Sequence, residues 1–205
     1  MKIDNIKKLI NDNRIIFLGD VHGNKSIPET IFNLIKDFKK SVFAIELPKQ
    51  PSGDIIDYFE NKLSKEELFQ NKYLKDALND NRLNANTLDL YKKLYDFGFK
   101  LEFLEDYENK LFNGKTKDKF IAEELKILLE KYPKYKIFLY AGNIHTLDKP
   151  IRILLIFKVK PIKYYLNNDI KKLILTIQFS NVKEITYNKE NNTVYYTYKQ
   201  SCLTS

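Results

Sequence analysis

The sequence contains a single cysteine, Cys202, which excludes a framework of intrachain disulfides and is typical of a protein from a reducing compartment. No apolar run approaches the length of about 18 residues that a membrane-spanning helix requires. The N-terminal stretch MKIDNIKKLINDN has apolar residues at helical spacing, but it lacks the apolar central region of a signal peptide. These absences predict a cytoplasmic protein without a membrane span.

Arginine is also scarce, although the formal net charge is +8. The arginines are Arg14, Arg82 and Arg152, whereas proteins that read bases or grip phosphates usually depend on this residue for bidentate contacts. The lysines are scattered and form no block of about five or six like charges, as a nucleic-acid-binding tail would. We therefore expect a solvated basic surface and no nucleic-acid partner.

The residues that are present favour one α/β domain over 1–205. A hydrophobic fraction of 43%, with 14% aromatic residues, is typical of a globular chain. Continuous apolar runs predict strands at 14–19, 41–48, 100–106 and 136–145, and helical patterns predict helices at 27–40 and 117–132. This alternation predicts a mainly parallel twisted sheet flanked by helices.

Two regions depart from this alternation. The stretch of about 53–98 is charged and helical in period, which predicts a helical insert. Beyond about residue 150, the stretch 151–160 is ambiguous between helix and strand. Apolar runs then predict a strand at 173–180 and a hairpin that turns at 190–192. We expect these last strands to extend the sheet as antiparallel edge strands.

Polar side chains stand at the ends of the predicted strands. They are GDVH at 19–22, Glu46, Glu105 with Asp106, and GNIH at 142–145. Ligands and catalytic groups of open α/β sheets collect beyond these carboxyl ends. Both histidines of the chain, His22 and His145, occupy the last position of a Gly-x-x-His. The carboxylate of Glu46 interrupts an apolar strand, which is costly unless it is paired, ligated or at the rim.

These side chains allow more than one chemistry. His22, Glu46 and His145 could hold a divalent metal with positions left for water. They could equally supply a general base and its orienting partners without a metal. Asp20 could hydrogen-bond a site water, take a ligand position or cap the following turn. A lone histidine after a strand is commonly a turn residue, but two in the same pattern favour a site.

GDVHGN is similar to the first signature of the calcineurin-like metallophosphatases, but the rest of that pattern is missing. The second strand runs into ELPKQP instead of a Gly-Asp, and GNIHT has one residue too many between Asn and His. We therefore expect no two-metal phosphatase site.

The chain has two Gly-x-x-His motifs, with a strand-end glutamate after the first. This combination resembles the superfamily of erythromycin esterases, ChaN-like haem-uptake proteins and the TraB/Tiki proteins. The likeness runs over about 14–179. GDVHG matches the Gly-Glu/Asp-x-His pattern of the family, Glu46 its strand-two glutamate, and AGNIHT its second histidine motif. Members usually have Arg-Asp at the start of the helix before the last motif, where this chain has Lys117 and Asp118.

The resemblance implies a hydrolase of an ester or amide bond that acts on a small-molecule or peptide substrate. His22, Glu46 and His145 would hold a metal such as Mn, Co or Zn, or activate water directly, and Lys117 would steady a developing oxyanion. The helical insert would overhang the strand ends and shape the pocket. Two alternatives stay open: a ChaN-like haem- or iron-binding protein, and a catalytically inactive interaction domain.

Overall fold

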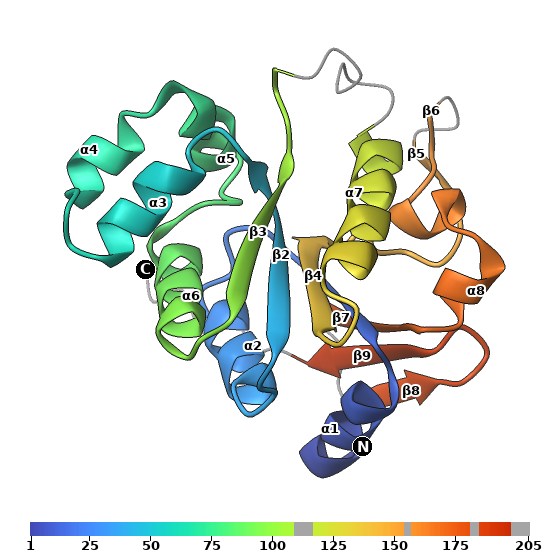
Figure 1. Ribbon diagram of the computed structural model, residues 1–205. Helices are drawn as coiled ribbons and strands as arrows, with labels where there is room; N and C mark the ends of the chain where they lie inside the picture. Colours follow the sequence, from blue (N-terminus) through green and yellow to red (C-terminus); the bar gives the residue numbers. More distant parts are fainter. Residues whose placement is uncertain (109–116, 154–156, 181–184, 198–205) are drawn as a thin grey trace, which may run out of the picture.

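The computed structural model describes residues 1–108, 117–153, 157–180 and 185–197. Its centre is a seven-stranded sheet with the order β3-β2-β4-β1-β7-β9-β8 (Figure 1). The strands are β1 (Ile15–Asp20), β2 (Ser41–Pro48), β3 (Lys100–Glu105), β4 (Lys136–Gly142), β7 (Ile174–Ser180), β8 (Thr186–Asn188) and β9 (Thr193–Thr197). All pairs are parallel except β8 with β9. The predicted fold class, a single α/β domain with a mainly parallel sheet, is confirmed.

The C-terminal strands differ from the sequence prediction in direction. β7 pairs with β1 in parallel, and β9 pairs with β7 in parallel, so only β8 is an antiparallel edge strand. Before β7 the chain crosses over the sheet through η3 (Ile162–Tyr165) and α8 (Asn168–Lys171), as a parallel connection requires. The ambiguous stretch forms β5 (Ile151–Ile153) and β6 (Phe157–Val159), a separate antiparallel pair.

Helices cover both faces of the sheet. They are α1 (Ile3–Asp12), α2 (Ile27–Ile35), α3 (Ser52–Phe59), α4 (Lys65–Phe69), η1 (Lys72–Leu74), α5 (Lys75–Asn79), α6 (Ala85–Asp96) and α7 (Lys117–Lys131), besides η3 and α8. On β1, Ile16 and Leu18 join the core formed with α1, α2 and α6, whereas Ile15 and Phe17 join the core formed with α7. All four are fully buried, and each such burial stabilises the fold by about 1.5–3 kcal/mol. The central strands therefore read as continuous apolar runs.

The insert between β2 and β3 is helical, as its period predicts. The capping box of Ser64 with Glu67 starts α4, and the Asn84 side chain accepts the main-chain N–H groups of Asn86 and Thr87 to start α6. Among the described residues no helix has both the length and the apolar character that a membrane crossing needs. Cys202 lies outside the described residues.

Candidate functional site

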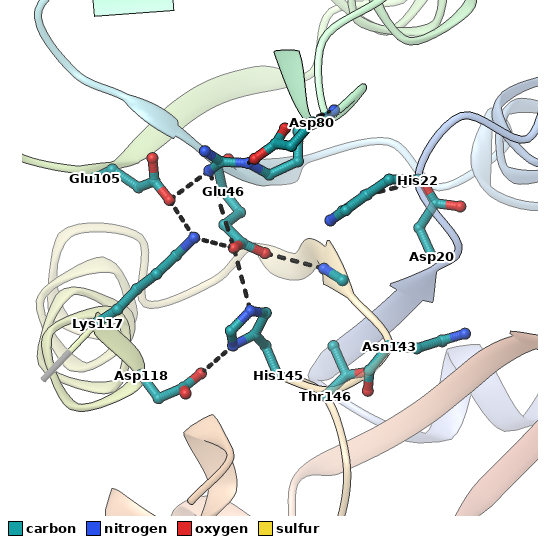
Figure 2. Close-up of polar contacts among 12 residues, drawn as sticks. Asp20, His22, Glu46, Asp80, Glu105, Lys117, Asp118, Asn143, His145 and Thr146 are labelled. Atoms are coloured by element: carbon teal, nitrogen blue, oxygen red, sulfur yellow. Dashed lines mark hydrogen bonds and ion pairs between the residues drawn. The ribbon is translucent and has the colours of Figure 1, made fainter. Parts of the chain in front are cut away.

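The carboxyl ends of four neighbouring strands meet at one edge of the sheet, and they bring the predicted residues together (Figure 2). Asp20 ends β1 and His22 follows it, Glu46 lies near the end of β2, and His145 follows β4. Lys117 begins α7, which packs beside these ends. The parallel direction of the strands causes this convergence, because their last residues all face the same side of the molecule.

Glu46 lies at the centre of this cluster. It continues the series Val42 and Ala44, whose side chains face α7, and a register irregularity of β2 lies beside it. Its side chain is only 3% exposed. Oε2 accepts the main-chain N–H of Gly142 at 2.9 Å, and Oε1 forms an ion pair with Lys117 Nζ.

Glu46 keeps its charge in this buried position. Burial by itself raises the pKa of the carboxyl group, but the charges of Lys117 and His145 and the hydrogen bonds from Lys117 and Gly142 hold that pKa at about 2. A carboxylate with so low a pKa accepts protons poorly at neutral pH. Glu46 is therefore better suited to orient its neighbours and to stabilise positive charge than to act as a general base.

A second buried carboxylate, that of Glu105 at the end of β3, also pairs with the ammonium group of Lys117. Lys117 Nζ lies 2.6 Å from Glu105 Oε1, and Nη1 of Arg82 donates to the same oxygen at 2.6 Å. Arg82 lies in the helical insert, in the turn between α5 and α6. It also donates to the main-chain oxygen of Glu46 at 3.2 Å. Burial lowers the pKa of Lys117, but Glu46 and Glu105 outweigh it and raise that pKa. Lys117 and Arg82 thus pair with the two buried carboxylates, and Arg82 also pairs with Asp80 at 2.8 Å.

His145 is oriented by Asp118, the second residue of α7. Its Nδ1 lies 2.8 Å from Asp118 Oδ1, and its Nε2 lies 3.6 Å from Glu46 Oε1. Burial lowers the pKa of His145, but the hydrogen bond to Asp118 and the charge of Glu46 raise it above its ordinary value. The side chain is 26% exposed, so a ligand can reach it. A reachable imidazole whose charged form is favoured is suited to donate a proton.

His22 has a carboxylate partner of its own. Its Nδ1 lies 3.8 Å from Asp20 Oδ2, which also accepts the hydroxyl of Tyr140. Asp20 is buried on the opposite face of the sheet from Glu46, because β1 alternates and Ile16, Leu18 and Asp20 share one face. Gly23, with φ of +84°, makes the turn that follows His22.

Gly142 allows the two imidazole rings to approach one another. A Cβ atom built on Gly142 would lie 2.9 Å from His22 Nε2 and 3.4 Å from His145 Cδ2. Both rings therefore lie against Gly142 at the end of β4. Any side chain at this position would occupy the space between them.

The predicted metal ligands His22, Glu46 and His145 are not arranged as a metal centre. Lys117 and the N–H of Gly142 face the two oxygens of Glu46, so hydrogen-bond donors take the places that a cation would need. Within the described ranges no group of three or more His, Cys, Asp or Glu side chains is placed to hold a metal ion. The physical reason is the ammonium group, which already neutralises the buried carboxylates.

Sequence reasoning did not assign Arg82, Glu105 or Asp118 to the site. Glu105 carried a signal, because it is a charged residue at the end of an apolar strand. Asp118 carried two signals, because it follows Lys117 at the place of the Arg-Asp pair of the resembled superfamily and is an acidic residue in the first turn of a helix, where it favours the helix dipole. Arg82 carried none, since it reaches Glu46 across 36 positions of the chain.

No family model matches the sequence, and no curated protein matches it. Solved structures do match. The type III effector HopBA1 aligns with 97% of this chain and 93% of its own, at 11% identity and a TM-score of 0.61. The Pasteurella multocida toxin, described with a thiol-protease-like catalytic triad in its C-terminal region, aligns with 93% of this chain at 12% identity and a TM-score of 0.54. This chain spans 25% of that toxin structure. At these identities the likeness concerns the fold alone.

A structure of cofacial haem binding to ChaN of Campylobacter jejuni also aligns, with 91% of this chain and 88% of its own. The identity is 13% and the TM-score is 0.42, which is too low to establish a common fold. The resemblance to the esterase, ChaN and Tiki superfamily, and the haem alternative that comes with it, therefore stay predictions.

Proposed function

We propose that this protein hydrolyses an ester or amide bond with its two histidines as the acid–base pair. One observation carries the proposal: His22 and His145, each facing its own carboxylate, meet above Gly142 at the carboxyl ends of parallel strands. Asp118 hydrogen-bonds Nδ1 of His145, which orients this ring and sets the nitrogen that faces the substrate. Asp20 lies 3.8 Å from Nδ1 of His22, beyond hydrogen-bond distance. Glu46 and Lys117 supply a fixed charge pair directly beneath.

The reaction needs two proton transfers, and the two rings can divide them. His22 Nε2 takes a proton from water while the water oxygen forms a bond to the substrate carbonyl carbon. The bond from that carbon to the leaving oxygen or nitrogen then breaks, and His145 Nε2 gives its proton to the leaving group. The raised pKa of His145 supports this assignment, because it favours the protonated ring before the reaction.

Among the described residues, Lys117 has one N–H donor without a protein partner. An ammonium group carries three N–H donors, and Glu46 and Glu105 engage it from the buried side. Its side chain is 26% exposed. The remaining donor is therefore suited to the developing oxyanion of the carbonyl, a contact that strengthens as the charge forms.

Activity measurements test the proposal. Purified protein is assayed on p-nitrophenyl esters and on fluorogenic peptides, with and without a chelator. We expect turnover that survives the chelator and falls by about 10²–10⁴-fold in His22→Ala and in His145→Ala. Both variants should unfold within about 1 kcal/mol of wild type, since partly exposed rim residues contribute little packing.

Asn33→Ala, at an exposed position on α2, serves as the matched control and should keep wild-type turnover. Full activity in both histidine variants contradicts the proposed acid–base pair. Activity that the chelator removes and Mn²⁺ or Zn²⁺ restores contradicts the metal-free arrangement.

A further inference from the structure

A groove of about 740 Å³ runs along β3, one of the two edge strands of the described sheet. Four consecutive β3 residues, 101–104, line it, and residues of α3 and α7 form its walls. Successive side chains of a strand point to opposite faces, so a groove lined by four residues in a row lies against the main chain of the strand. The groove therefore reaches the edge of β3 that faces away from β2, chiefly at Leu101 and Glu102, which are partly exposed, whereas Phe103 and Leu104 are buried.

The main-chain groups on this edge lack partners in the described part of the chain. β3 pairs with β2 alone. Apart from that ladder, no hydrogen bond joins the main chain of 101–104 to any described residue. In a parallel pair, alternate residues direct their N–H and C=O groups away from the neighbour, and such an edge is a template for a further strand.

The walls of the groove combine apolar and charged side chains, and the charges are paired with one another. Lys62, for example, lies 2.5 Å from Glu60 and 3.6 Å from Asp57. Ile127 on α7 is 53% exposed and faces the groove. At one end Lys49 pairs with Glu124 at 2.7 Å, and at the other Lys131 pairs with Glu102 at 2.7 Å. A ligand in the groove meets main-chain groups of β3, apolar side chains and charged side chains that already neutralise one another. These features suit an extended polypeptide and do not suit an anionic polymer.

We propose that this groove binds an extended polypeptide segment, which adds to β3 as a new edge strand, and that the hydrolysed substrate is a polypeptide. β3 ends at Glu105, whose carboxylate contacts Lys117, so a segment that leaves the groove passes the candidate site. Main-chain pairing supplies the affinity in this mode of recognition, and the side chains of the walls supply preference. The substrate assignment rests on the proposed function, whereas the docking does not.

Gly53 offers a way to fill the groove without disturbing the fold. It lies in α3 and lines the groove, and a Cβ built there would meet no atom within 4 Å. Binding is measured by fluorescence anisotropy with reduced, carboxymethylated α-lactalbumin as an unfolded probe, in the His145→Ala background so that no probe is cleaved. We expect Gly53→Trp to bind at least tenfold more weakly. Asn33→Trp, an aromatic residue at an exposed helical position outside the groove, should bind unchanged.

The main-chain contacts are tested with peptides from the tightest-binding segment of the probe. N-methylation at every second residue removes the N–H donors from one edge of the peptide, and methylation at the intervening residues removes them from the other. One methylated form should lose binding at least tenfold and the other should keep it. Equal binding of both forms, or wild-type binding by Gly53→Trp, overturns the docking. If only one methylated form binds, but the protein hydrolyses esters and does not cleave the bound peptide, the docking stands and only the substrate assignment is overturned.

Discussion

Replacing Lys117 with methionine keeps the aliphatic stem of the side chain and removes the ammonium group that two buried carboxylates share. Glu46 is 3% exposed and Glu105 is fully buried. Leaving a buried charge without its partner costs about 3–5 kcal/mol. Arg82 still bonds Glu105 in the variant, and Lys117 itself is about a quarter exposed. We therefore expect the lower end, about 3 kcal/mol of lost stability at neutral pH.

The pH dependence of stability measures the contacts of Glu46 with Lys117, His145 and Gly142 together. The pKa of Glu46 falls from 4.5 to about 2 in the folded protein, and at 1.36 kcal/mol per unit this corresponds to about 3 kcal/mol. Because the folded pKa is lowered, this stabilisation is present above pH 4.5 and is lost as the pH falls toward 2. Without Lys117 the pKa of Glu46 rises. The difference between wild type and Lys117→Met should therefore shrink across this acid range.

Urea unfolding followed by circular dichroism, at pH 7 and at steps down to about pH 2.5, measures both effects. Lys117→Arg keeps the charge and should lie within about 1 kcal/mol of wild type. Lys119→Met removes an exposed lysine from the same helical turn and controls for the loss of one charge. Turnover of Lys117→Met should fall about ten- to hundredfold. Equal stability and equal acid dependence of wild type and Lys117→Met would refute this account of the network.

Three further substitutions probe the rest of the site. Glu46→Gln keeps the shape and the bond to Gly142 but removes the charge that faces His145, so turnover should fall at least hundredfold in a folded protein; wild-type rates would exclude Glu46 from the mechanism. Asp118→Asn should lower the pKa of His145 in an NMR titration. In wild type, protonated His145 stabilises the fold, and this contribution is lost as the pH rises through the raised pKa of His145. Asp118→Asn should lose less stability over the same pH range. An unchanged His145 titration contradicts the contact with Asp118. Gly142→Ala should push the ring of His22 aside and reduce turnover, while the free energy of unfolding changes by less than about 1 kcal/mol. Undiminished turnover in this variant would show that the rings need not meet there.

Much of the fold followed from local patterns. Apolar runs that end at polar residues predict strands buried on both faces, and the parallel direction of such strands brings their ends to one edge. His22, Glu46 and His145 could be singled out for that reason alone. The prediction needed no knowledge of strand order, because every carboxyl end of a parallel sheet faces the same side.

The tertiary structure decided which charges meet. Glu46 reads equally well as a metal ligand or as an ion-pair partner in the sequence, and only the placement of Lys117 at the start of α7 distinguishes the two. Arg82 reaches this network from the insert, and β3 is an edge strand only because β2 pairs with β4 on its other side. The spacing of apolar residues along a helix or strand is a local property, because it follows from which faces of that element are buried. Ion-pair partners, strand direction after a long crossover and the identity of the sheet edge depend on the path of the whole chain, which no local pattern records.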